Sequence, residues 1–378
     1  MNDLRWTGNT AGSSIARLVR SFLIVVAAAG LLAPMALRAQ SAPEQPPSSV
    51  WIRPQHPGDP LIWGRRDGVV FGLPSPGGMG GPRGLIRVGI VSPDTGKPAL
   101  LNFIAIEPVI LGPGSRFGRM AFSELEESQL DPGQRGKRLW VGDGQVAGTL
   151  ETLHAGHNTV ERLSVPIDVE RYSANGAHVH LIASVESDHP DELRLSVFQY
   201  PDSPALEELT VTATMGNYER LRQLWLRGHN ISSLALYSCY QGDAFTEHEN
   251  YPSDEMLRTA DGDAIVLATS NEASPASAPS HAKAHWHYAF AMRLTQYWRV
   301  PASDIQPDLR VRVNGRRVYW ASHDPVPGGP AFENFEVRQR YKEGQTFIFG
   351  VTPKEPWQFT PPIPELSGDR GEDTSSSH

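Results

Sequence analysis

The residues best suited to chemistry gather in the segment from His285 to Arg299. Read with a period of two, its even positions are almost all apolar, whereas its odd positions carry imidazole, phenol and guanidinium groups. Such alternation is typical of a β-strand with one face on a core. The polar face is either a surface for binding or proton transfer, or the solvated side of a plain strand. The odd positions include His285, His287, Arg293, Thr295, Tyr297 and Arg299.

Tyrosine, histidine and arginine recur on other expected strands, which suggests a shared chemistry. In β-elimination on a uronate, an arginine or asparagine neutralises the sugar carboxylate while a tyrosine or histidine takes and returns protons. The expected proton-transfer residues are Tyr218, His285, His287, Tyr297 and His323. The leading hypothesis is therefore a polysaccharide lyase that acts on a uronate-containing glycan.

Arginine and aromatic side chains also suggest a surface for an anionic glycan. Arg310, Arg312, Arg317 and Tyr319 share one face of an expected strand pair. Arginine forks bind carboxylates bidentately, and aromatic faces stack on sugar rings. The plainer alternative is that each arginine pairs with a carboxylate of the protein itself. The expected substrate-binding residues are Trp63, Arg220, Arg222, Arg299, Arg310, Arg312 and Tyr319.

Two clusters of glutamates keep a second reaction open. Glu333 and Glu336 form one cluster, and Glu124, Glu126 and Glu127 form the other. Glycoside hydrolysis needs two carboxylates that face each other across a cleft, which spacing in the sequence does not establish. A glycoside hydrolase is therefore an alternative to the lyase, and a non-catalytic glycan-binding or cell-surface interaction protein is another.

The histidine pairs fall short of a metal site. His178 and His180, like His285 and His287, place two imidazoles on one side of a strand. Ligation needs three or four convergent groups, and spacing supplies only two at a time. The chain has no His-Glu-x-x-His motif, no phosphate-binding loop and no Gly-x-Ser-x-Gly elbow. We therefore expect neither a metal nor a cofactor.

The first 39 residues predict export. Arg17 and Arg20 precede an apolar run over 22–33, and small residues follow up to an expected cleavage after Ala39. The run is too short to span a bilayer comfortably, and no later segment is a transmembrane candidate. The mature protein is thus expected to be secreted or periplasmic, with residues 40–50 as a disordered Pro/Ser-rich spacer.

Charge and cysteine content narrow the partners and the source of stability. The whole chain has a net charge of −8, and the leader carries four arginines against one aspartate, so the mature protein has about −11. An acidic global field argues against nucleic-acid binding. Cys239 is the only cysteine, which excludes an intramolecular disulfide and leaves stability to a large core. The expected partner is a polysaccharide or oligosaccharide.

Turn residues and alternation predict an all-β fold. Gly and Pro punctuate the chain evenly, and short alternating segments lie between them. Asn314–Gly315 predicts a hairpin turn within 309–320, and Gly216–Asn217 predicts another within 209–226. Only 123–130 reads as a helix.

These elements define the expected domain organisation. Many antiparallel strands with few short helices indicate a large antiparallel β-sandwich. We expect this sandwich to occupy residues 51–355. The polar, Pro-rich end of the chain, 356–378, is expected to be a disordered tail.

Five phrases carry a family resemblance: Trp63–Gly72, Asn102–Pro108, Met215–Arg220, Tyr319–His323 and Ala331–Glu336. They resemble a group of uncharacterised secreted bacterial proteins. Their sequence pattern is also similar to that of large β-sandwich proteins that bind or modify polysaccharides, including mutarotase-like and lyase-associated sandwiches. The resemblance implies a sandwich fold and a carbohydrate ligand, and it assigns no catalytic residue, because fold alone does not imply function.

Overall fold

The computed structural model describes residues 49–73, 86–110, 119–120, 147–155, 158–172, 175–214, 220–270, 294–318, 325–359 and 362–366. The regular elements of these residues are nearly all strands, arranged in two antiparallel sheets of ten strands each. The expectation of an all-β sandwich is confirmed. The expected leader and the expected helix over 123–130 lie outside the described residues. No helix in the described ranges combines the length and apolarity that crossing a membrane requires.

The first sheet, called sheet I, has the strand order β1-β2-β3-β4-β5-β11-β19-β18-β14, with β6 paired to β5. At its centre, β11 lies between β5 and β19, and Val211 is opposite both Ile106 and Val337. The strands of sheet I are β1 (Trp51–Ile52), β2 (Ile62–Arg65), β3 (Val69–Gly72), β4 (Ile86–Val91), β5 (Pro98–Ile110), β6 (Arg119–Met120), β11 (Leu206–Thr214), β14 (Glu249–Pro252), β18 (Arg310–Arg316) and β19 (Ala331–Arg340).

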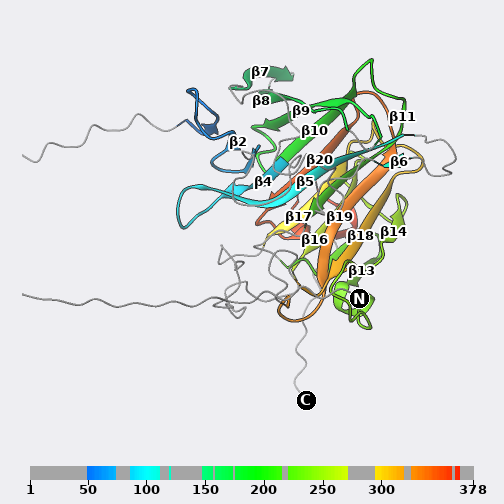
Figure 1. The fold of residues 1–378 in the computed structure, drawn as a ribbon. Helices are drawn as coiled ribbons and strands as arrows, with labels where there is room; N and C mark the ends of the chain where they lie inside the picture. Colours follow the sequence, from blue (N-terminus) through cyan, green and yellow to red (C-terminus); the bar gives the residue numbers. More distant parts are fainter. Residues whose placement is uncertain are drawn as a thin grey trace, which may run out of the picture. The chain divides into compact units, whose positions relative to one another are not determined.

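The second sheet, sheet II, has the order β13-β12-β16-β17-β20-β10-β9-β8-β7, with β15 paired to β16. Figure 1 shows β20 and β10 side by side in this layer, and β19 and β18 side by side in the other. The strands of sheet II are β7 (Thr149–Ala155), β8 (Asn158–Asp168), β9 (Val179–Glu186), β10 (Glu192–Gln199), β12 (Gln223–Leu226), β13 (His229–Ser232), β15 (Leu257–Arg258), β16 (Ala264–Thr269), β17 (Thr295–Val300) and β20 (Thr346–Thr352). One short helix, α1 (Ser233–Leu236), follows β13.

One continuous hydrophobic core joins the inner faces of the two sheets. Alternate residues of each strand enter it, since successive side chains of a strand point to opposite faces. Trp298 is fully buried there, and its indole N–H donates to the Phe335 carbonyl of the other sheet at 2.8 Å. The core members include Trp63, Phe71, Val311, Phe335 and Val337 from sheet I and Leu181, Leu195, Val266, Trp298 and Phe349 from sheet II.

The hairpin expected at Asn314–Gly315 is wrong. Both residues lie inside β18, which continues to Arg316 with β14 on one side and β19 on the other. Gly315 does not take the positive φ that a type I′ turn requires. A β-carbon at Gly315 would meet the Tyr237 ring at 2.6 Å, so the glycine serves close packing instead of a turn.

The hairpin expected over 209–226 is also wrong. Its first half is β11, which pairs with β5 and β19 in sheet I. Its second half contains β12, which pairs with β13 and β16 in sheet II. The chain therefore changes sheets between these strands, and Gly216–Asn217 lie outside the described residues. Long-range pairing overrides the local turn signal here.

Part of the expected disordered tail is folded. After β20, the described chain forms two 3₁₀ turns, η3 (Pro356–Gln358) and η4 (Pro364–Leu366). Phe359, Ile363 and Leu366 pack on a second small cluster that contains Tyr297. This cluster lies on the outer face of sheet II, because Tyr297 alternates with the core residue Trp298. The C-terminal segment, defined as the described residues 356–359 and 362–366, therefore covers part of that face.

Candidate functional site

The odd positions of β17 are buried, although the sequence presents them as a polar face. Only the last part of 285–299 belongs to the described residues. There the even position Trp298 enters the core as expected, while Tyr297 and Arg299 keep only 4% and 7% of their surface exposed. The C-terminal segment accounts for the burial of Tyr297, since Phe359 meets its ring edge-on at 4.9 Å.

Tyr297 and Arg299 are held by a network of buried carboxylates. The Tyr297 hydroxyl donates to Glu192 Oε1 at 3.1 Å, and Arg299 Nε donates to the same oxygen at 3.0 Å. Arg299 also pairs with the second oxygen of Glu192 and with Asp263. Burial, helped by the negative charges of Glu192 and Asp191, raises the pKa of Tyr297 well above its ordinary value. Tyr297 is thus a proton donor at neutral pH and is unsuited to act as a base.

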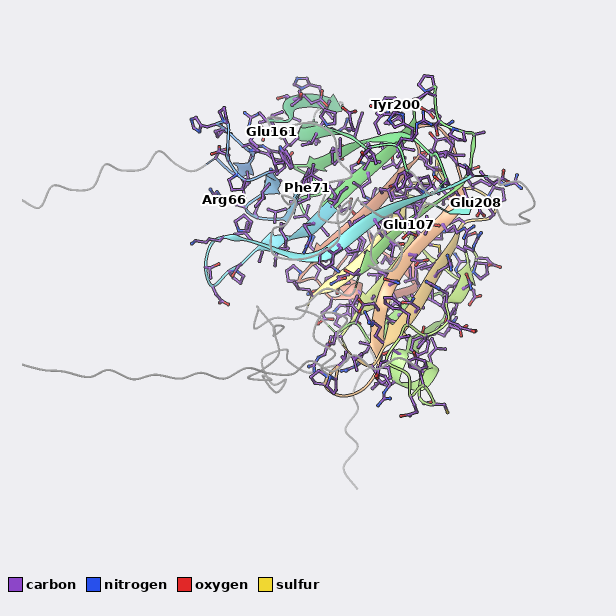
Figure 2. The ribbon with its side chains drawn as sticks, viewed as in Figure 1. Arg66, Phe71, Glu107, Glu161, Tyr200 and Glu208 are labelled. Carbon is purple, nitrogen blue, oxygen red and sulfur yellow. The ribbon has the colours of Figure 1, made fainter. Side chains whose placement is uncertain are left out.

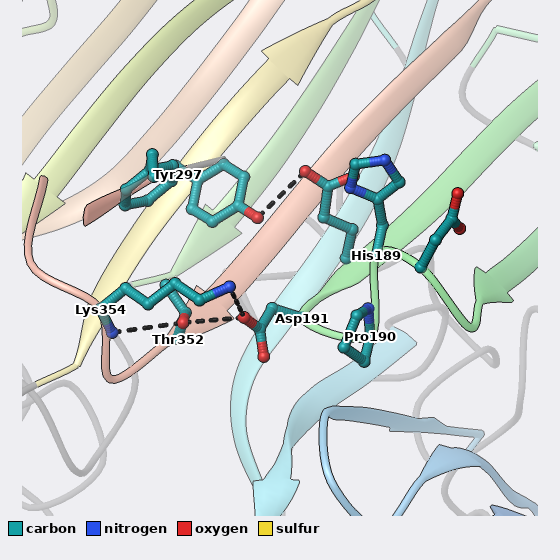
Figure 3. A pocket seen from close by; sticks show the side chains of 9 residues that line it. His189, Pro190, Asp191, Tyr297, Thr352 and Lys354 are labelled. Carbon is teal, nitrogen blue, oxygen red and sulfur yellow. Dashed lines mark hydrogen bonds and ion pairs between the residues drawn. The ribbon is translucent and has the colours of Figure 1, made fainter. Parts of the chain in front are cut away.

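A small cavity opens beside this network (Figure 3). Its volume of about 90 Å³ is far below the roughly 300–1,000 Å³ of ordinary ligand pockets. Lys354 Nζ and Thr352 Oγ1 both contact Asp191 Oδ2, at 2.9 and 3.0 Å, so part of its polar lining is already paired. The cavity is too small for a sugar ring and does not mark the substrate site.

Arg220 and Arg222 brace a loop. Both are almost fully buried, with 3% and 2% of their surface exposed. Arg220 Nη1 donates to the Pro327 carbonyl at 3.1 Å, and Arg222 Nη2 donates to the Gly329 carbonyl at 3.0 Å. These guanidinium groups therefore satisfy loop carbonyls that would otherwise be buried without donors.

Trp63 and the first histidine pair also have packing roles. Trp63 is 1% exposed and stacks on Phe71 at 5.6 Å, so its ring offers no free face to a sugar. His178 Nδ1 lies 2.7 Å from Asp202, and His180 stacks on Phe198 at 5.1 Å. Across the described parts of the chain, no three His, Cys, Asp or Glu side chains gather as a metal site.

Arg310 and Arg312 lie on the outer face of sheet I, and both pair with carboxylates. Arg310 Nη2 is 3.0 Å from Glu208 Oε1. Arg338 Nε donates a hydrogen bond to Glu208 Oε2 at 2.7 Å. Arg312 Nη1 is 3.2 Å from Glu336 Oε2. For these two arginines the geometry matches the plainer alternative, pairing within the protein. The expected site residues Tyr218, His285, His287, Tyr319 and His323 lie outside the described residues, as do Glu124, Glu126 and Glu127.

The outer face of sheet I is polar, and its side chains are buried or half-buried. Val211, Val337 and Val311 face the core, so the residues that alternate with them face outward. Glu107 on β5 and Glu208 on β11 belong to this face and are labelled in Figure 2. The outward set across β11, β19 and β18 is Thr210, Thr212, Thr214, Asn334, Glu336, Arg338, Arg310, Arg312 and Asn314.

A β-bulge gives this face its special geometry. Val313 is opposite Phe335, but Gly315 is opposite Phe332, so β19 has one residue more than β18 in this interval. Phe332 and Phe335 both enter the core, which leaves Glu333 and Asn334 on the outer side. Asn314 Oδ1 accepts a hydrogen bond from the Asn334 backbone N–H at 3.0 Å, so this donor at the bulge has a partner. Bulges often re-aim side chains next to active sites.

The bulge gathers two glutamates in different surroundings. Glu333 is 7% exposed, and burial raises its pKa to about 7 against the opposing charge of Arg316. Glu336 meets His248 Nε2 at 2.9 Å through one oxygen and Arg312 through the other. Glu333, whose pKa burial raises to about 7, thus lies three positions along β19 from a glutamate that an arginine and an imidazole contact. Two carboxyl groups in contrasting environments are the arrangement of an acid with a partner carboxylate.

Sequence reasoning noted this glutamate pair but missed the residues that define its setting. His248 is 88 positions from Glu336, so no local spacing signals their contact. The sequence predicts a turn at Asn314, whereas in the structure its side chain accepts a backbone hydrogen bond at the bulge. Comparison of the chain with protein-family models, with curated proteins and with solved structures gave no match.

Proposed function

We propose that the protein is an exported glycoside hydrolase, with Glu333 as general acid and Glu336 as the partner carboxylate. The observation that carries this proposal is the pair of outward glutamates at one β-bulge in contrasting environments. Hydrolysis of a glycosidic bond requires such a pair, one to protonate the leaving oxygen and one to act at the anomeric carbon or on the attacking water. Export rests on the leader over 1–39.

Glu333 has the properties of the acid. With a pKa of about 7, roughly half of its carboxyl groups hold a proton at neutral pH. Glu336 contacts Arg312 and His248, which compensate a carboxylate charge there. Inverting and retaining hydrolases differ in the separation of their two carboxyl groups, which leaves room for a water only in the inverting case. The anomer of the first product separates these two routes.

The charges on this face favour a neutral glycan over a uronate. Arg310 and Arg338 share Glu208, Arg312 pairs with Glu336, and the charge of Arg316 acts on Glu333. Each of these arginines thus has a carboxylate partner within the described residues. Uronate elimination needs a cation directed at the sugar carboxylate and a base. Tyr297, the described member of the expected proton-transfer residues, is unsuited as the base because burial raises its pKa well above its ordinary value. For these reasons we propose hydrolysis as the reaction.

The test is a panel of neutral and uronate polysaccharides and aryl glycosides assayed for new reducing ends and for unsaturated products. We expect reducing ends without ultraviolet-absorbing product. Glu333→Gln and Glu336→Gln should each lower kcat by about 10²–10⁴, the usual contribution of a general acid or base. Glu207→Gln, an exposed glutamate on β11, is the matched control and should be fully active.

Three results would redirect the assignment. Unsaturated product from a uronate polymer would replace hydrolysis by β-elimination. Binding without any product would favour the glycan-binding alternative. Full activity of Glu333→Gln would remove this residue as the acid.

A further inference from the structure

His248 links the inner carboxylate to solvent. Its Nε2 lies 2.9 Å from Glu336 Oε1. The Glu336 side chain is 5% exposed, whereas the His248 side chain is 28% exposed. Glu336 therefore has little direct access to water, and the imidazole has one edge on the carboxylate and another part at the surface.

A second neighbour competes for the same imidazole nitrogen. Asn314 Nδ2 lies 3.4 Å from His248 Nε2. The amide of Asn314 is oriented by its Oδ1, which accepts the Asn334 backbone N–H at 3.0 Å, so its NH₂ group faces the imidazole. A hydrogen bond to the Glu336 carboxylate requires a proton on His248 Nε2. A hydrogen bond from the Asn314 NH₂ group requires a lone pair on the same nitrogen. Nε2 thus has a suitable neighbour in either protonation state.

Among the described residues, the other charged group in contact with Glu336 is unable to take its proton. Arg312, on β18, faces Glu336 Oε2 and has no acceptor atom. Asn314 contributes only an amide. On the segment of His248 itself, Glu247 and Glu249 flank the histidine and are exposed. His248 is therefore the titratable side chain in contact with Glu336 among the described residues.

We infer that His248 is a proton shuttle between Glu336 and solvent, an inference that rests on the proposed hydrolytic function. In one turnover, Glu333 gives its proton to the leaving glycosidic oxygen, and Glu336 takes a proton from the water that adds to the anomeric carbon. Glu336 Oε1–H then passes its proton to His248 Nε2, and the resulting imidazolium loses its Nδ1 proton to solvent. Before the next turnover the ring regains a solvent proton at Nδ1 and releases the Nε2 proton to solvent, which restores the lone pair on Nε2. Glu333 regains a proton from solvent, so protons and charge balance over the cycle.

The decisive test is chemical rescue. His248→Ala in the full chain should lower kcat at least tenfold in dilute buffer and leave KM within about twofold. Added imidazole should restore kcat with saturation, because it can occupy the space of the lost ring and carry the proton. His229→Ala, which removes an exposed histidine paired with Glu255 on sheet II, is the matched control and should show no buffer dependence.

A structural role for His248 predicts a different result. His248→Gln retains a hydrogen-bonding side chain but does not titrate near neutral pH, so it should fold normally and remain slow. Loss of activity that neither imidazole nor buffer restores in a variant of wild-type thermal stability would overturn the shuttle. So would wild-type kcat in His248→Ala at every buffer concentration.

A spectroscopic measurement tests the contact without turnover. In the wild type, the ¹⁵N resonance of His248 Nε2 should lie between the values of protonated and unprotonated nitrogen, because the proton is shared with Glu336. Glu336→Gln should move it to one extreme. Identical resonances in the two proteins would refute the shared proton, even if hydrolysis is established. Wild-type activity of Glu333→Gln would instead reject the proposed function and would leave the contact between His248 and Glu336 unaffected.

Discussion

The ring of Tyr297 lies across Gly350, its register partner on the neighbouring strand β20. A β-carbon at Gly350 would overlap the Cζ and Cε1 atoms of the ring. The glycine therefore lets the phenol reach Glu192, to which its hydroxyl donates. Pairing an aromatic ring with a cross-strand glycine also restores packing that the glycine itself lacks.

The first prediction is that Gly350→Ala destabilises the protein by about 1–3 kcal/mol through overpacking. Urea unfolding monitored by tryptophan fluorescence measures the change. Tyr297→Ala removes the clash, so the double variant should lose less stability than the two single variants together. Strict additivity would show that the two residues do not interact.

The second prediction concerns Arg299, which neutralises Glu192 and Asp263 in a buried site. Arg299→Met leaves two buried carboxylates without their cation and should cost about 3–5 kcal/mol at pH 7. The carboxylates of the variant then favour protonation in the folded state, so the deficit should shrink as pH falls below 5. Thermal unfolding at several pH values measures this, and a deficit independent of pH would contradict it.

The third prediction is a dependence of stability on Glu333. Burial raises its pKa in the folded protein to about 7 from 4.5. The folded state binds this proton more tightly than the unfolded state, so the contribution is fully present below pH 4.5 and is lost as pH rises through 7. The loss should approach roughly 3 kcal/mol. Glu333→Gln should remove this slope between pH 4.5 and 7, whereas the exposed control Glu207→Gln should retain it.

The fourth prediction concerns the pH dependence of activity, which the protonation of Glu333 should set. A general acid must be protonated, so kcat/KM should fall above about pH 7, where Glu333 loses its proton. The initial rate of a substrate with a good leaving group, such as a nitrophenyl glycoside, depends less on protonation and should show a weaker alkaline limb. Equal alkaline limbs for good and poor leaving groups would assign the titration to another residue.

Alternation was the reliable signal in the sequence. It placed Trp298 in the core and predicted short antiparallel strands, and both are present. Alternation is reliable because successive side chains of a strand point to opposite faces, so the pattern depends only on residues of that strand. Turn signals were less reliable, since Asn314 and Gly315 became strand residues once β14 and β19 paired on both sides of β18.

By itself the sequence determined the all-β class, the inner faces of several strands and the presence of a glutamate pair at Glu333 and Glu336. Only the tertiary structure decided that Tyr297 is buried, because the C-terminal segment that covers its ring follows it by more than fifty positions. Only the structure brought His248 to Glu336 and inserted the bulge beside Glu333. These relationships depend on strand order and register across a sheet, which long-range packing sets and local spacing does not encode.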